Sequence, residues 1–164
     1  MKLIKLDKKQ IKGISVRTTN SNEFNSETSK IGALYQTFDK KVPVDYKNGA
    51  RVYGVYYNYD SDHSGEYSVL AGTDKTTLLP TEPLEQVTLM SGDYLVFEAK
   101  GEVPQVVIET WSKVWDYFSS EETQHQRAYT TDFEYYKNQK EIELYIAIKY
   151  SHSNKASETV LLDN

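Results

Sequence analysis

Short segments in which hydrophobic and polar residues alternate predict β-strands along most of the chain. These strands are expected at residues 11–18, 51–59, 66–72, 86–90, 93–101, 127–136 and 141–150. Two further segments repeat apolar residues every three or four positions, which predicts helices with one buried face. The helical positions are Ile31, Leu34, Tyr35 and Phe38 in the first segment and Trp111, Val114, Trp115 and Phe118 in the second. The pattern therefore indicates an α+β fold.

An internal repeat relates the two helical segments. A shift of 80 positions places Ile31 on Trp111 and Tyr35 on Trp115, and the strand before each helix matches under the same shift. The order strand–helix–strand–strand therefore occurs twice. Repeated units of this size are expected to pack about a pseudo-twofold axis and to leave a groove between them, which is a natural ligand site.

The repeats also define the domain organisation. The first unit covers about residues 10–75 and the second about residues 85–149. Together they are expected to form a single domain over residues 1–150, and residues 151–164 are expected to form a polar C-terminal tail. A chain of 164 residues suits one domain of this kind, because domains contain roughly 150 residues.

The last predicted strand places a carboxylate beside a tyrosine. Its aliphatic residues share one face, which should cover the core, whereas Glu143 and Tyr145 share the other. This second face is either solvated or enclosed by the groove between the repeats. If it is enclosed, Glu143 needs a partner, because a carboxylate in an aromatic cavity is costly unless it is paired or protonated. A cationic ligand held against aromatic rings would provide that partner.

Composition excludes several classes of protein. The chain has no cysteine, which rules out disulfides, thiolate catalysis and cysteine zinc sites. Its net charge of −5 argues against direct nucleic-acid binding. No apolar run approaches the ~18 residues of a membrane span and no secretory signal is visible, so we expect a cytoplasmic protein without membrane contact. The 14 tyrosines suit a wet aromatic pocket or an interface.

Other candidate chemistry is weak. Asp60, Asp62, His63 and Glu66 form an acidic turn, but their spacing matches no EF-hand or zinc motif, so a solvated turn is the preferred interpretation. No phosphate-binding, dinucleotide-binding or serine-hydrolase motif is present. We therefore expect no metal and no cofactor. Trp111 packs either in the core, as a helical apolar residue usually does, or into the groove.

Four stretches of the sequence, taken in order, resemble a known family: GISVRTTNSNE with IGALYQTF, VYGVYYNYDSDHSGEYSVLAG, SGDYLVFEAKGEVPQVVIETWSKVWDYF, and DFEYY with EIELYIAIK. The family comprises the effector-binding domains of multidrug-responsive bacterial transcription regulators, including standalone members similar to the gyrase-inhibitory protein. The resemblance covers roughly residues 10–149. It implies two strand–helix–strand–strand units with pseudo-twofold symmetry, a curved antiparallel sheet and a ligand groove between the units.

The resemblance also implies a ligand class and a binding site. Members of the family bind bulky, often cationic and aromatic compounds, and a carboxylate in the final strand, which matches Glu143, counters the cation. Aromatic residues line the groove, and the matching positions are Trp111, Tyr145, Tyr94, Tyr53 and Tyr67. The chain lacks the helix-turn-helix that the regulators carry, so it resembles a standalone ligand-binding domain without direct nucleic-acid contact.

Three functions stay open, in this order of preference. The first is a non-enzymatic binding module for small hydrophobic cations, with Glu143 as the counter-charge. The second is a protein-interaction module, comparable to a gyrase inhibitor, that acts on a separate protein partner. The third is a hydrolase of strained electrophilic compounds, in which Glu143 beside Tyr145 acts as general base for water. The sequence does not distinguish a binding role of Glu143 from a catalytic role.

Overall fold

The computed structural model of the protein describes residues 1–75, 83–149 and 160–161. Its strands are β1 (Lys2–Leu6), β2 (Lys9–Thr19), β3 (Val52–Tyr57), β4 (Glu66–Thr73), β5 (Glu85–Leu89), β6 (Gly92–Lys100), β7 (Thr131–Tyr136), β8 (Glu141–Ala147) and β9 (Val160–Leu161). Its helices are α1 (Asn20–Glu23), α2 (Ile31–Lys41) and α3 (Gln105–Ser119), and a 3₁₀ turn follows α2 at Tyr46–Asn48. Most of the tail predicted for residues 151–164 lies outside the described residues.

The strands form one curled sheet in the order β5-β2-β4-β3-β7-β8-β6-β1-β9. All neighbours pair antiparallel except β9, which pairs parallel with β1. The predicted repeat is confirmed, because β2-α2-β3-β4 and β6-α3-β7-β8 have the same order along the chain. In the sheet, the order β2-β4-β3 is followed by the equivalent strands in reverse, β7-β8-β6, as a twofold relation requires. The predicted α+β class is confirmed as well. Strand β1, which the periodicity did not predict, extends the sheet beyond β6.

The two repeats meet where β3 pairs with β7 at the centre of the sheet. In this pair Gly54 lies opposite Glu134, and the shift of 80 positions that relates the repeats also carries residue 54 onto residue 134. A position that faces its own repeat equivalent lies on the pseudo-twofold axis. The axis therefore passes through the pair Gly54–Glu134.

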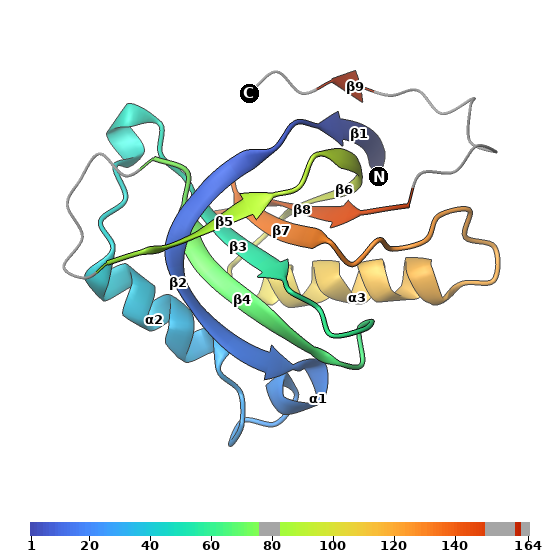
Figure 1. Cartoon of the computed structure of the whole chain (residues 1–164), viewed down its shortest axis with the longest axis horizontal. Helices are drawn as coiled ribbons and strands as arrows, with labels where there is room; N and C mark the ends of the chain where they lie inside the picture. Colours follow the sequence, from blue (N-terminus) through green and yellow to red (C-terminus); the bar gives the residue numbers. More distant parts are fainter. Residues whose placement is uncertain (76–82, 150–159, 162–164) are drawn as a thin grey trace.

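Helices α2 and α3 lie on the same side of the sheet and leave its centre uncovered (Figure 1). Helix α2 packs on β2 and β4 through Leu34 and Phe38, and α3 packs near β6 and β8 through Val106 and Val114. A third apolar cluster fills the opposite, inner face of the curled sheet. The two helices therefore lie on either side of β3 and β7, the central strands of the sheet.

Within the described part of the chain, no helix is long and apolar enough to cross a membrane.

The short helix α1 helps to fix the start of α2. Helix α2 has no side-chain cap on Lys30, its N-cap residue. Instead, the carboxylate of Glu23 accepts hydrogen bonds from the backbone N–H of Lys30 (3.0 Å) and of Ile31 (3.0 Å). A negative charge at this position also interacts favourably with the helix dipole. Glu23 also accepts a hydrogen bond from Thr18 on β2 at 2.6 Å and thereby holds α2 against the end of β2.

Candidate ligand-binding cavity

A cavity of about 1220 Å³ lies between α2 and α3, above β3 and β7. Its walls come from equivalent positions of the two repeats, Ile31 and Tyr35 on α2 and Trp111 and Trp115 on α3. The neighbouring helix positions, which belong to the same apolar faces, pack instead onto the sheet. A cavity of this size, lined mainly by apolar and aromatic groups, accommodates a drug-sized ligand.

The floor of the cavity is formed around Glu134 on β7, a carboxylate that is 1% exposed. Four aromatic side chains donate hydrogen bonds to it. They are Tyr35 (3.0 Å) and Tyr136 (2.9 Å) on Oε1, and Tyr56 (2.7 Å) and Trp111 (2.7 Å) on Oε2. These donors come from α2, β3, β7 and α3, so the carboxylate ties both repeats together at the pseudo-twofold axis.

The charge of Glu134 has no cationic partner, as far as the described residues show. Asp132, two residues earlier on the same face of β7, is equally buried but is neutralised. Its Oδ2 contacts Nη2 of Arg127 at 2.7 Å and accepts a hydrogen bond from Tyr59 at 2.6 Å. Its Oδ1 accepts from the backbone N–H of Ala147 at 2.8 Å. One of the two buried carboxylates of β7 therefore has a resident cation and the other has only neutral donors.

The tyrosines around Glu134 are held in their neutral, hydrogen-bond-donating form. Burial is the main cause that raises the pKa of Tyr35, Tyr56 and Tyr136 well above the usual value, and the negative charge of Glu134 is the next. Ionising any of them would place a second negative charge beside the carboxylate in a buried site. The three hydroxyls therefore remain donors to Glu134 throughout the neutral pH range.

Gly54 makes room for this arrangement from the opposing strand. A Cβ atom at this position would lie 2.0 Å from the hydroxyl of Tyr35 and 2.7 Å from Oε1 of Glu134. Both distances are far shorter than van der Waals contact, so any side chain at position 54 would displace the tyrosine from the carboxylate.

We therefore expect Gly54→Ala to lower the free energy of unfolding by about 1–3 kcal/mol, the usual cost of overpacking a close-packed site. Chemical denaturation monitored by tryptophan fluorescence would measure the loss. Gly32→Ala is the matched control, because a Cβ there meets nothing within 4 Å. Gly32→Ala should not lower the stability, since Ala favours a helix over Gly, and a Gly54→Ala variant as stable as the wild type would contradict the expected clash.

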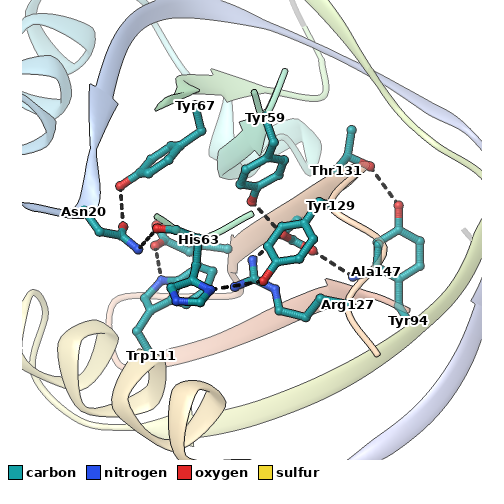
Figure 2. A network of polar contacts seen from close by, with 12 residues as sticks. Asn20, Tyr59, His63, Tyr67, Tyr94, Trp111, Arg127, Tyr129, Thr131 and Ala147 are labelled. Atoms are coloured by element: carbon teal, nitrogen blue, oxygen red, sulfur yellow. Dashed lines mark hydrogen bonds and ion pairs between the residues drawn. The ribbon is translucent and has the colours of Figure 1, made fainter. Parts of the chain in front are cut away.

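A polar network borders the end of the cavity near α1 (Figure 2). Tyr67 donates to Oδ1 of Asn20 (2.7 Å), and Nδ2 of Asn20 donates to the carbonyl oxygen of His63 (2.9 Å). The guanidinium of Arg127 lies over the ring of Tyr129 at 4.5 Å. Nδ1 of His63 lies 3.4 Å from the hydroxyl of Tyr129, so the network links α1, the loop between β3 and β4, and the segment that enters β7.

The family profile of Cass2, the integron-associated effector-binding protein, matches residues 2–148. The chain belongs to this family. An integron cassette protein from the mobile metagenome of Vibrio cholerae is 41% identical, and its crystal structure superposes with a TM-score of 0.80 over 90% of this chain and 94% of that one. Comparison with curated proteins gave no match.

Two more distant structures share the fold. SAV2435 bound to tetraphenylphosphonium is 17% identical, with a TM-score of 0.62 over 96% of this chain and 98% of that one. A putative transcription regulation protein from Staphylococcus aureus is 19% identical, with a TM-score of 0.64 over 91% and 97% of the two chains. The predicted likeness to effector-binding domains is thereby confirmed for the family and for the fold.

The residues predicted to bind ligand lie on two different faces of the sheet. Trp111 and Tyr67 line the cavity. The other four, Glu143, Tyr145, Tyr94 and Tyr53, are not among the cavity-lining residues. Tyr145, Tyr94 and Tyr53 belong to the apolar cluster on the inner face of the sheet, and Glu143 accepts a hydrogen bond from Tyr145 at 2.8 Å. A binding role for these four residues stays a prediction.

The acidic turn between β3 and β4 is engaged by a basic side chain of β2. Nη2 of Arg17 lies 2.6 Å from Asp60, and its Nε lies 3.6 Å from Glu66. His63, from the same turn, lines the cavity. The turn therefore contributes one residue to the site.

The residues that the sequence did not single out include the centre of the site. Tyr35, Tyr56, Tyr136 and Glu134 were not assigned to the groove, although all four line it. The repeat offered a usable signal, since the shift of 80 positions that aligns the helices also carries Gly54 onto Glu134 and residue 56 onto residue 136. Extending the alignment beyond the helices would have drawn attention to these two strands.

Proposed function

We propose that the chain is an effector-binding protein for bulky lipophilic cations, which the cavity holds with Glu134 as their counter-charge. The unneutralised state of Glu134 is the observation that supports this most. A buried carboxylate without a cation is costly, whereas Asp132 on the same strand face has Arg127. A cationic ligand would supply the missing charge. The rings of Tyr35 and Trp111, which donate to the carboxylate, would also attract it through their π-faces.

The hydrogen bonds of Glu134 indicate which cations fit. An ionised carboxylate offers about four acceptor sites, and Glu134 accepts from four donors, two on each oxygen. A primary ammonium would lose hydration in the cavity and find no free acceptor on this carboxylate. A quaternary ammonium, a phosphonium or a delocalised aromatic cation has no such N–H groups to satisfy. SAV2435, which shares this fold, was solved with tetraphenylphosphonium, a cation of this kind.

Tetraphenylphosphonium and tetraphenylborate provide a direct test, since they have nearly the same shape and opposite charge. We expect the phosphonium to change the fluorescence of Trp111 and Trp115, which line the cavity, in a saturable manner. We expect the borate to bind at least about 100-fold more weakly, because its charge is repelled by the buried carboxylate. Isothermal titration calorimetry would measure both affinities. Equal binding of the two ions, or binding of neither, would refute the proposal.

A further inference from the structure

The end of the cavity that lies away from α1 contains two basic residues. Arg51 immediately precedes β3 and Lys137 immediately follows β7, and both line the cavity. The two segments touch, since Nε of Arg51 donates to the carbonyl oxygen of Lys137 at 3.1 Å. Asp39, exposed on the last turns of α2, is the carboxylate that lines this end.

The guanidinium of Arg51 is positioned by neutral groups, whereas its backbone N–H donates to Oδ1 of Asp74 at 3.0 Å. Its Nη1 donates to the carbonyl oxygens of Ala50 (2.8 Å) and Tyr46 (3.3 Å). In the part of the chain that the structure describes, Arg51 makes no ion pair with a carboxylate. Carbonyl oxygens fix the orientation of a guanidinium but carry no net charge. The partly buried guanidinium therefore retains a positive charge at the cavity wall, in contrast to Arg127, which is neutralised by Asp132.

The sheet places Arg51 and Glu134 at different positions along the cavity. Glu134 lies directly opposite Gly54 in the pairing of β3 with β7, and Arg51 precedes Gly54 by three residues. At about 3.3 Å per residue along a strand, the backbone positions of Arg51 and of Gly54, opposite Glu134, are roughly 10 Å apart. The cavity therefore presents a negative charge at its centre and a positive one at this end.

We propose that the end of the cavity formed by Arg51 and Lys137 is an anion subsite. The natural effector would then be bipolar, with a cationic centre at Glu134 and a carboxylate or a similar anionic group at Arg51. This inference rests on the proposed function, because Glu134 fixes the cationic end. Guanidinium groups bind carboxylates with directed, charge-assisted hydrogen bonds. Lys137 adds a second positive charge, and Asp39 opposes the anion in part.

A rhodamine ethyl ester and the corresponding free acid test the subsite, since they share one cationic dye skeleton and differ by a carboxylate. We expect the wild type to bind the free acid about tenfold more tightly, the scale of a hydrogen-bonded charged contact. Lys137 is exposed, so Lys137→Gln should fold and should reduce this preference about threefold. Arg51→Gln should reduce the preference at least as much as Lys137→Gln does, and Asp39→Asn should increase it.

The outcomes separate this inference from the proposed function. If the ester binds at least as tightly as the free acid, the anion subsite is refuted while cation binding stands. A preference for the acid that is unchanged in both Lys137→Gln and Arg51→Gln would also overturn the inference, because the carboxylate would then be bound elsewhere. If the cavity binds neither dye nor tetraphenylphosphonium, the proposed function fails and the subsite fails with it.

Discussion

Replacing Glu134 by Gln is expected to weaken the binding of tetraphenylphosphonium by roughly 100-fold, because truncating one partner of a buried charge pair costs about 2–5 kcal/mol. Gln keeps the size of the side chain and the planar terminal group, so the cavity keeps its shape. The hydroxyls of Tyr35 and Tyr136 can turn to accept from the new amide, while Tyr56 and Trp111 continue to donate to its oxygen. Calorimetric titration of the variant with the phosphonium would measure the loss.

Glu143→Gln is the matched control for this experiment. It makes the same chemical change on the face of the sheet where the resemblance to the family placed the counter-charge, and Glu143 lies outside the cavity-lining residues. We expect its affinity for the phosphonium to stay within about twofold of the wild type, because separated charges near a surface are screened. A loss in Glu143→Gln with none in Glu134→Gln would reverse the assignment proposed for the two carboxylates.

The fold could be predicted from the sequence because it depends on two local patterns, the alternation in the strands and the apolar face of the helices, and because the helical pattern occurs twice. Alternation identified most strands, and the apolar face shared by both helices revealed the repeat. Two copies of one unit then imply a symmetric arrangement with a groove between them. The pairing partners of the outer strands were not predictable in this way. For example, β1 pairs with β6 and β5 pairs with β2, although periodicity shows only which residues share a face.

Because periodicity shows only which residues share a face, it also led to Glu143 as the predicted counter-charge. Alternation in β8 correctly separates an aliphatic face from the face of Glu143 and Tyr145. The aliphatic face was expected to lie under the helices, but alternation does not show that the cavity lies on that same side, between the helices. Because Ile142 and Leu144 pack in the cluster under α3, Glu143 points to the other side of the sheet. Trp111 was a sound candidate since its position is defined by the helix face itself.

Glu134 was not predicted as a site residue because its strand is central to the sheet only after the two repeats have packed together. In the sequence DFEYY, two acidic residues alternate with aromatic ones, a pattern that is also typical of a solvated strand face. Side chains from both repeats cover this face, Tyr35 and Trp111 over Glu134 and Arg127 over Asp132, so that Asp132 and Glu134 become 0% and 1% exposed. Their burial depends on contacts between the repeats that no local pattern encodes.

Asp132→Asn is expected to lower the free energy of unfolding by about 3–5 kcal/mol, because it leaves the buried guanidinium of Arg127 without its counter-charge. The side chain of Arg127 is only 7% exposed, and its Nε has no hydrogen-bond partner within the described residues. Among the residues that the structure describes, Asp132 provides the charge that compensates for burying the arginine. Urea denaturation monitored by circular dichroism would measure the loss. Glu134→Gln leaves no buried cation unpaired, so its free energy of unfolding should fall less.

The double variant Asp132→Asn with Arg127→Met separates the ion pair from the general packing of this region. Removing both charges should recover most of the stability lost in Asp132→Asn, because neither partner then remains buried and unpaired. Additive losses in the double variant would contradict a role for the charge pair. Because Arg127 already neutralises Asp132, cation affinity should change little in the double variant once it is folded. The two carboxylates of β7 would thus differ in function, Asp132 stabilising the domain and Glu134 binding the ligand.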